Sequence, residues 1–155
     1  MTINYNLEST CALSGNRQLA KDFNIEKLKS TLESLIQSGY DTFLNGMAIG
    51  FDSVCFSVLH SLRKKYKIKI IACIPCKNQN YKYTEEQNKV YKKMLTEADE
   101  CILVSENYTK GCMQKRNMFM VDNCSALVVY QRKSIGGTKN TIEYAKRMGK
   151  VIIFI

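Results

Sequence analysis

Residues 111–145 read GCMQKRNMFMVDNCSALVVYQRKSIGGTKNTIEYA, and they contain the clearest structural signals in the chain. The apolar run Ala126 to Tyr130 predicts a buried strand, with one helix before it and another after the Gly136-Gly137-Thr138 turn. Free N–H groups at the start of that second helix lie beside glycines without a Cβ, so the turn predicts an anion site. Arg116 and Asn117, on the preceding helix, can supply a guanidinium fork and an amide to the same ligand.

The rest of the chain alternates between short apolar runs and segments with helical spacing. The apolar runs predict six strands, at residues 9–13, 42–44, 68–74, 101–104, 126–130 and 151–155. Helical spacing predicts intervening helices, including residues 25–36, 51–62 and 85–96. Continuous apolar strands need cover on both faces. We therefore expect one α/β domain over residues 1–155, with a doubly wound, mainly parallel six-stranded sheet and helices on both faces.

Composition describes an ordinary folded domain. The chain has 155 residues, of which 45% are hydrophobic and 24% charged, as is usual for globular proteins. No apolar run approaches the ~20 residues that a membrane span needs, and residues 1–8 lack the pattern of a signal peptide. Seven scattered cysteines favour reduced thiols over a disulfide framework. These features predict a cytoplasmic protein with no membrane partner.

Metal sites and catalytic relays lack their usual residues. Cys73 and Cys76 have the spacing of a redox pair or half a zinc site, but no second pair follows, and His60 is the only histidine. A nucleophile–histidine relay also needs a histidine near the site. His60 falls in the middle of the 51–62 helix, where we expect a surface residue. The sequence therefore predicts no metal, no cofactor and no histidine-based catalysis.

The net charge of +9 is unevenly distributed. Residues 53–84 contain no acid, and they carry seven basic residues: Arg63, Lys64, Lys65, Lys67, Lys69, Lys77 and Lys82. One interpretation is a solvated helix end, because cations are favourable at a helix C-terminus. The other is a surface that attracts nucleic acid or guides an anionic ligand. We favour the first and keep nucleic acid open as a partner.

Glycine turns follow three of the predicted strands: Gly15 the first, Gly46 and Gly50 the second, and Gly136-Gly137 the fifth. In a parallel sheet the carboxyl ends of the strands lie at one edge, where such sheets bind their ligands. Bare backbone at three turns along that edge predicts a phosphate-bearing ligand.

Three other side chains each have two interpretations. Asp52, in the first turn of its helix, either complements the helix dipole or accepts a hydrogen bond from a ribose hydroxyl. Tyr81 and Tyr83 either stack on a base or are exposed loop aromatics. Both alternatives stay open at this point.

These residues, in order, resemble the SLOG superfamily of Rossmann-like nucleotide-ligand proteins, and in particular its small stand-alone bacterial and phage members. The superfamily includes the DNA-processing Smf proteins and the cytokinin-activating phosphoribohydrolases. The matching residues span almost the whole chain: Gly15, Arg17, Gly46, Met47, Ala48, Gly50, Asp52, Ile74, Pro75, Gln79, Tyr108, Gly111, Cys112, Met113, Arg116, Asn117, Met120, Val121, Asp122, Gly136, Gly137, Thr138, Thr141, Tyr144 and Ala145. The resemblance implies a Rossmann-like fold and a pocket for a nucleotide or nucleotide-derived molecule.

Loops and resemblance together indicate a set of ligand-binding residues: Gly15, Asn16, Arg17, Gly46, Met47, Ala48, Gly50, Asp52, Arg116, Asn117, Gly136, Gly137, Thr138 and Thr141. Two of these depart from the family pattern. Asn16 stands where close relatives usually carry histidine, and Thr141 stands where the sugar-cleaving relatives place a catalytic glutamate. Glu143 lies two residues further on, about 200° around the helix, and we expect it to face away from the pocket.

Three functional hypotheses follow. The first is non-catalytic binding of a nucleotide or nucleotide-derived ligand, for sensing or sequestration, at the carboxyl edge of the sheet. The second is a nucleotide N-glycosidase that uses another acid, such as Asp52 or Glu106. The third is single-stranded DNA binding, as in the Smf relatives, which the positive charge favours. A homo-oligomer is compatible with each of them.

Overall fold

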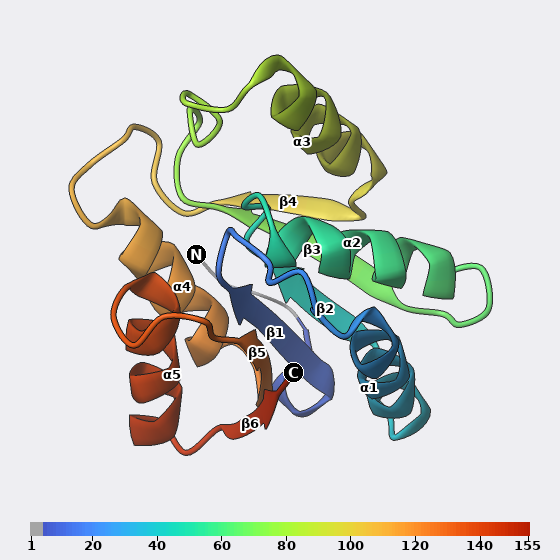
Figure 1. The fold of residues 1–155 in the computed structure, drawn as a ribbon. Helices are drawn as coiled ribbons and strands as arrows, with labels where there is room; N and C mark the ends of the chain where they lie inside the picture. The colour runs from blue at the N-terminus through green and yellow to red at the C-terminus, as the bar shows by residue number, and fades with distance from the viewer. Residues whose placement is uncertain (1–4) are drawn as a thin grey trace.

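The computed structural model describes residues 5–155. The first four residues of the predicted domain, and with them the start of residues 1–8, lie outside the described residues. Within the described range, six strands form one sheet in the order β4-β3-β2-β1-β5-β6 (Figure 1). Their bounds are β1 Thr10–Gly15, β2 Thr42–Asn45, β3 Lys69–Ile74, β4 Glu100–Leu103, β5 Ala126–Tyr130 and β6 Val151–Phe154. All neighbouring strands are parallel, so the sheet is wholly rather than mainly parallel.

Helices cover both faces of this sheet, which confirms the predicted architecture (Figure 1). One face carries α1 Ile25–Gln37, α2 Phe51–Leu62 and α3 Glu85–Glu97, and the other carries α4 Cys112–Asp122 and α5 Gly137–Arg147. A short 3-10 turn, Leu7–Ser9, precedes β1. Alternation along β1 divides the core, because Cys11 and Leu13 pack under α1 and α2 while Ala12 packs under α4 and α5. The predicted elements are all present, with ends shifted by one or two residues at most.

The position of β1 creates the switch point of the sheet. β1 pairs with β2 on one side and with β5 on the other, where Gly15 lies opposite Tyr130. The chain builds outward from β1 to β4 and then returns through α4 to place β5 beside β1 (Figure 1). The loops that leave β1 and β5 therefore run to opposite faces, and they open a crevice at the carboxyl edge.

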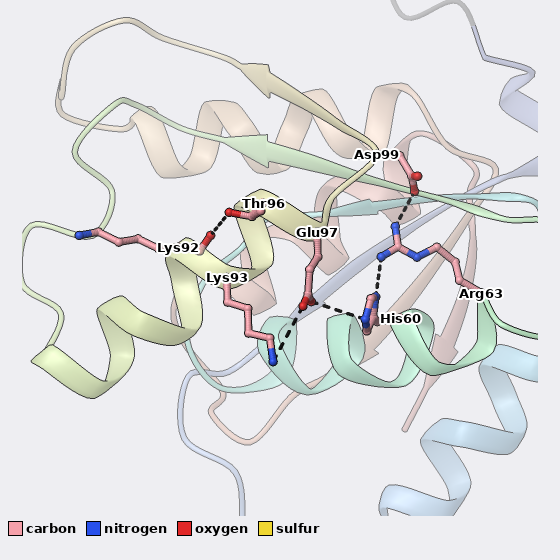
Figure 2. Close-up of polar contacts among 7 residues, drawn as sticks. All are labelled: His60, Arg63, Lys92, Lys93, Thr96, Glu97 and Asp99. Carbon is pink, nitrogen blue, oxygen red and sulfur yellow. Dashed lines mark hydrogen bonds and ion pairs between the residues drawn. The ribbon is translucent and has the colours of Figure 1, made fainter.

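Polar contacts hold α3 to the C-terminal end of α2 (Figure 2). Arg63 contacts His60 through Nη2 and Nδ1 at 2.5 Å, and its Nη1 donates to Asp99 at 2.9 Å. His60 Nε2 lies 3.8 Å from a Glu97 carboxylate oxygen, and the other oxygen of Glu97 lies 3.9 Å from Lys93 Nζ. The His60 side chain is 41% exposed and lies at the surface, as expected, where it also contacts Glu97 of the neighbouring helix. These contacts fix the C-terminal end of α3, while its N-terminal half borders the carboxyl edge of the sheet.

Candidate functional site at the carboxyl edge of the sheet

A cleft of about 690 Å³ opens where the loops after β1 and β5 diverge. This volume lies within the range of roughly 300–1,000 Å³ that is typical of small-molecule sites. Most of the predicted ligand-binding residues line the cleft: Gly15, Asn16, Arg17, Ala48, Asp52, Arg116, Asn117, Gly136, Gly137 and Thr138. Residues that were not predicted to bind the ligand complete its walls, among them Gln18, Ile49, Gln87, Met113, Lys133 and Ile135. The glycine loops that were predicted to converge therefore meet at one place.

The other four predicted residues lie outside this cleft. Met47 and Gly50 line a smaller pocket beside it. Gly46 lies beneath it, against the guanidinium of Arg116. Thr141 is buried within α5, and its hydroxyl donates to the carbonyl of Gly137 at 2.8 Å. The first three residues therefore shape the site without facing the cleft, and the Thr141 hydroxyl is already bonded to its own helix.

Asn16 joins the two loops that form the crevice. Its side-chain Nδ2 donates to the hydroxyl of Thr138 at 3.2 Å, and its Oδ1 accepts from the backbone N–H groups of Arg132 and Lys133. Its backbone carbonyl accepts from the N–H of Phe51 at 3.2 Å. One asparagine thus fixes the start of α5, the loop before it and the start of α2 relative to β1. Its role at this position is to set the shape of the cleft.

The helix N-termini at this edge are of two kinds. α1 and α3 begin with side-chain caps, in which Asn24 Oδ1 accepts from Lys27 N–H and Thr84 forms a capping box. The other three helices begin at a glycine with no side-chain cap: Gly50, Gly111 and Gly136. At the start of α5, the N–H groups of Gly137 and Thr138 have no hydrogen-bond partner within residues 5–155. Free N–H groups at a helix start carry partial positive charge and favour an anion.

Arg116 lies beneath the cleft with only 5% of its surface exposed. Its Nη1 donates to the carbonyl oxygens of Gly46 and Cys73, the latter at 3.1 Å, and its Nε donates to Asn117 Oδ1 at 2.9 Å. Burial lowers the pKa of Arg116, and the nearby Asp52 opposes that shift. The guanidinium thus ties the carboxyl ends of β2 and β3 together. Among the described residues only Nη2 of Arg116 is left without a protein partner, so Nη2 is the nitrogen that remains for the predicted contact with phosphate.

Asp52 is the buried acid of the cleft, with 6% of its surface exposed. Its Oδ2 accepts from the N–H of Ala48 at 3.1 Å, while its Oδ1 is buried and has no hydrogen-bond partner among the described residues. Burial raises the pKa of Asp52 to about 6, although Arg116 and the Ala48 N–H act in the opposite direction. A buried acceptor without a donor costs free energy until a proton or a ligand supplies one.

The raised pKa of Asp52 predicts a pH-dependent cost of folding. Folding favours the protonated form of Asp52. The resulting contribution to the stability of the fold is fully present below the ordinary pKa of 3.8, and it is lost as the pH rises through about 6. An Asp52→Asn variant mimics the neutral acid. Between pH 4 and pH 7.5, we expect its free energy of unfolding to rise relative to that of the parent protein by up to about 3 kcal/mol. Urea unfolding of both proteins across this range measures the difference. A difference that stays constant with pH would contradict the buried-acid assignment.

Asn45 and Gln79 were not predicted as site residues, and both are buried beneath the cleft. Asn45 Oδ1 accepts from the N–H of Met47 at 2.8 Å, and its Nδ2 donates to the carbonyl of Asp52 at 2.9 Å. Gln79 Nε2 donates to the carbonyl of Gly46 at 3.0 Å. These bonds hold Met47 at a φ of 62°, which is unusual for a residue with a side chain. A polar residue at the end of an apolar strand was the available signal for Asn45, whereas Gln79 appeared only in the family match.

The glycines of the site serve different purposes. A Cβ on Gly15 would lie 2.4 Å from the ring of Phe51, and a Cβ on Gly50, whose φ is +85°, would lie 2.1 Å from the carbonyl oxygen of Arg17. Packing within the protein therefore requires both glycines. At Gly137 the nearest atom to an added Cβ would be 3.9 Å away. The backbone at Gly137 is open, as close approach of a ligand requires.

The basic tract is divided between the two edges of the sheet. Residues 63–69 run from the end of α2 to the start of β3, at the edge opposite the cleft, while Lys77 and Lys82 follow β3 on the cleft side. Lys65 forms an ion pair with Glu33 at 3.1 Å, so its charge is already balanced by an acid of the protein. The structure favours the helix-end interpretation, because these residues do not form one continuous face.

The described part of the chain has neither a cluster of metal-binding side chains nor a helix suited to span a membrane. Cys73 and Cys76 are buried, and burial raises the pKa of Cys73 to about 12. No group of three or more His, Cys, Asp or Glu side chains within residues 5–155 is arranged to hold a metal ion. None of the helices in that range is both long and apolar enough to cross a membrane.

Residues 17–151 match the model of the YspA SLOG family. The chain belongs to this family. Among curated proteins, the SPbeta prophage-derived protein YoqJ of Bacillus subtilis (strain 168) is 35% identical over 136 residues, which cover 79% of this chain and 80% of YoqJ. The match confirms the resemblance to small SLOG proteins that the glycine loops suggested.

Solved structures of DNA processing protein A (DprA) share the fold of this YspA SLOG protein. DprA from Streptococcus pneumoniae superposes with a TM-score of 0.64 at 18% identity, over 95% of this chain and 50% of DprA. DprA from Helicobacter pylori, which has a described single-stranded DNA binding mode, superposes with a TM-score of 0.67 at 17% identity, over 94% of this chain and 64% of DprA. The chain thus spans less than two thirds of either DprA, and the similarity establishes the Rossmann-like fold.

Proposed function

We propose that this YspA SLOG protein binds a nucleotide or nucleotide-derived molecule in the cleft without cleaving it, as a sensor or a sequestering protein. The observation that carries the proposal is that one cavity contains both unpaired hydrogen-bond donors and an unpaired acceptor. Free N–H groups at the start of α5 need an acceptor, and the buried Oδ1 of Asp52 needs a donor. A nucleotide supplies both, because its phosphate accepts and its ribose hydroxyls donate.

The absence of cleavage follows from the side chains at the start of α5. A glycosidase needs a carboxylate beside the anomeric carbon to stabilise the transition state and activate water. By the resemblance, Thr141 stands where the sugar-cleaving relatives place a glutamate, and its hydroxyl is bonded to the Gly137 carbonyl. Glu143 is exposed and lies 3.7 Å from Lys139. The remaining acid in the cleft is Asp52, so any turnover would pass through that residue; Glu106 does not line the cleft.

The test is calorimetric titration with AMP, GMP, CMP, UMP and NAD, first with the native protein and then with a Gly137→Leu variant. We expect one or more of these nucleotides to bind, and we expect the leucine to weaken binding at least roughly tenfold by blocking the approach of phosphate to the backbone. Because an added Cβ at Gly137 has 3.9 Å of clearance, the melting temperature should change little. Lys146→Leu, at the exposed far end of the same helix, is the matched control.

Two outcomes would contradict the proposal. The first is native protein that binds none of these nucleotides, and the second is a Gly137→Leu variant with undiminished affinity. Chromatography of the same mixtures checks for free base. Multiple turnovers of base release that disappear in Asp52→Asn would replace the binding function by an N-glycosidase activity.

Single-stranded DNA is a second candidate ligand, favoured by the net charge of +9 and by the fold shared with H. pylori DprA. Binding through phosphates falls steeply with salt. Titration of a fluorescent thymidine oligonucleotide between 50 and 200 mM salt, as an additional arm of the same experiment, separates this candidate from a small-molecule function. The divided basic tract makes it the weaker of the two proposals.

A further inference from the structure

A second pocket of about 280 Å³ adjoins the cleft, between the loop after β2 and the N-terminal half of α3. Arg17, Ile49 and Gln87 line both cavities, so the pocket is a side chamber of the cleft. Its volume is at the lower limit of about 300 Å³ for complete ligand sites. The side chamber therefore has room for one part of a ligand whose remainder lies in the cleft.

The walls of the side chamber suit a flat ring. Met47 and Met94 supply flexible thioether side chains, and Val90 stands at the rim with half of its surface exposed. Tyr83 and Tyr91 meet edge to face, with centroids 5.6 Å apart, and form an aromatic wall. Thioethers and aromatic rings both pack well against aromatic ligands.

Two residues that line the side chamber carry hydrogen-bond donors with no acceptor among residues 5–155. The hydroxyl of Tyr83 is buried and has no hydrogen-bond partner among residues 5–155. Burial raises the pKa of Tyr83, and the N–H of Ile49 acts in the opposite direction, so the phenol keeps its proton and that proton lacks an acceptor. Gln87 Oε1 accepts from the N–H of Thr84 at 2.9 Å, which leaves its Nε2 as a donor. Ring nitrogens or carbonyl oxygens on the edge of a base would satisfy such donors.

We propose that the side chamber binds the heteroaromatic base of the nucleotide while the start of α5 holds its phosphate. This inference rests on the proposed function and names the ligand class more closely, as nucleotides with an intact base rather than sugar phosphates. Arg17 lies where the two cavities join, next to the sugar or phosphate of a ligand that spans them. Of the two loop tyrosines, Tyr83 is assigned to the base, since Tyr81 is 78% exposed and lines neither cavity.

The experiment compares nucleotides with ribose 5-phosphate, which has the sugar and phosphate but no base. In the native protein we expect the best of AMP, GMP, CMP and UMP to bind at least roughly tenfold more tightly than ribose 5-phosphate. Val90→Trp fills the chamber from its rim, and it should reduce nucleotide affinity to the level of ribose 5-phosphate. Lys89→Trp, at the neighbouring exposed position of α3, is the control. Tyr83→Phe removes one donor and should weaken nucleotide binding about 2–10-fold without affecting ribose 5-phosphate.

The outcomes separate this inference from the function on which it rests. If Val90→Trp and Tyr83→Phe both keep full nucleotide affinity while Gly137→Leu loses it, the assignment of the base to the side chamber is wrong. The proposed function would then still stand. Equal affinity of the native protein for nucleotides and ribose 5-phosphate would overturn it as well. If the native protein binds neither class of compound, both proposals fail together.

Discussion

Replacing Arg116 by alanine should lower the free energy of unfolding by about 3–5 kcal/mol, the usual cost of removing one member of a buried charged network. Three hydrogen bonds from the guanidinium disappear, to the carbonyls of Gly46 and Cys73 and to Asn117. Asp52 also loses the cation that holds its pKa down, so that pKa should rise above about 6. Urea unfolding should therefore show a larger loss at pH 8 than at pH 5, because the carboxylate is charged only at the higher pH.

Two further variants test the source of this effect. Lys115→Ala removes a cation from the adjacent, exposed position of the same helix, and it should change stability by less than about 0.5 kcal/mol. Arg116→Lys keeps the charge but cannot bond several acceptors in one plane, so we expect an intermediate loss. An Arg116→Ala protein as stable as the parent at both pH values would show that the guanidinium does not hold β2 and β3 together.

Gly50→Ala should destabilise the fold by about 3 kcal/mol or more, since it combines two costs. A φ of +85° is strained for any residue with a side chain, at roughly 1–3 kcal/mol. The new Cβ would also lie 2.1 Å from the carbonyl oxygen of Arg17, so the backbone of the first glycine loop would have to move. The loop and the start of α2 would then shift together, and the cleft would lose its shape. Thermal and urea unfolding measure the loss.

Two other glycines provide matched comparisons for Gly50. Gly39 has a φ of +115° with nothing within 4 Å of an added Cβ, so Gly39→Ala isolates the conformational cost. Gly137 has neither a positive φ nor a close neighbour, and Gly137→Ala should leave stability nearly unchanged. We expect the loss in the free energy of unfolding to be largest at Gly50, smaller at Gly39 and smallest at Gly137. Equal losses at Gly50 and Gly39 would show that the contact with Arg17 relaxes at no cost.

Local signals were sufficient to predict the elements and their arrangement. Fully apolar runs such as Ala126–Tyr130 mark strands that are covered on both faces, and glycine at Gly136 marks the end of the turn that follows. Parallel topology then places every turn after a strand at one edge. That rule brought Gly15 and Gly137 into one predicted site, and the structure places both in the same cleft.

Two of the missing parts of the prediction involve partners that are distant in the sequence. The sequence predicted Arg116 as a ligand-binding residue, but only the structure shows the carbonyls of Gly46 and Cys73 that bind it. The basic residues 63–69 and Lys77 are close in sequence, yet β3 carries them to opposite edges of the sheet. A single strand can thus separate neighbours that composition groups together.

The different roles of the glycines have a consequence for how this family is compared across genomes. Gly15, Gly46 and Gly50 are fixed by atoms of the protein itself, namely Phe51, Arg116 and the backbone of Arg17. A descendant that had lost its ligand would therefore still retain these three glycines, because selection for folding alone preserves them. Gly137 has no such internal constraint. Its replacement by larger residues in a lineage would be the informative sign that the lineage had abandoned the ligand or exchanged it for another.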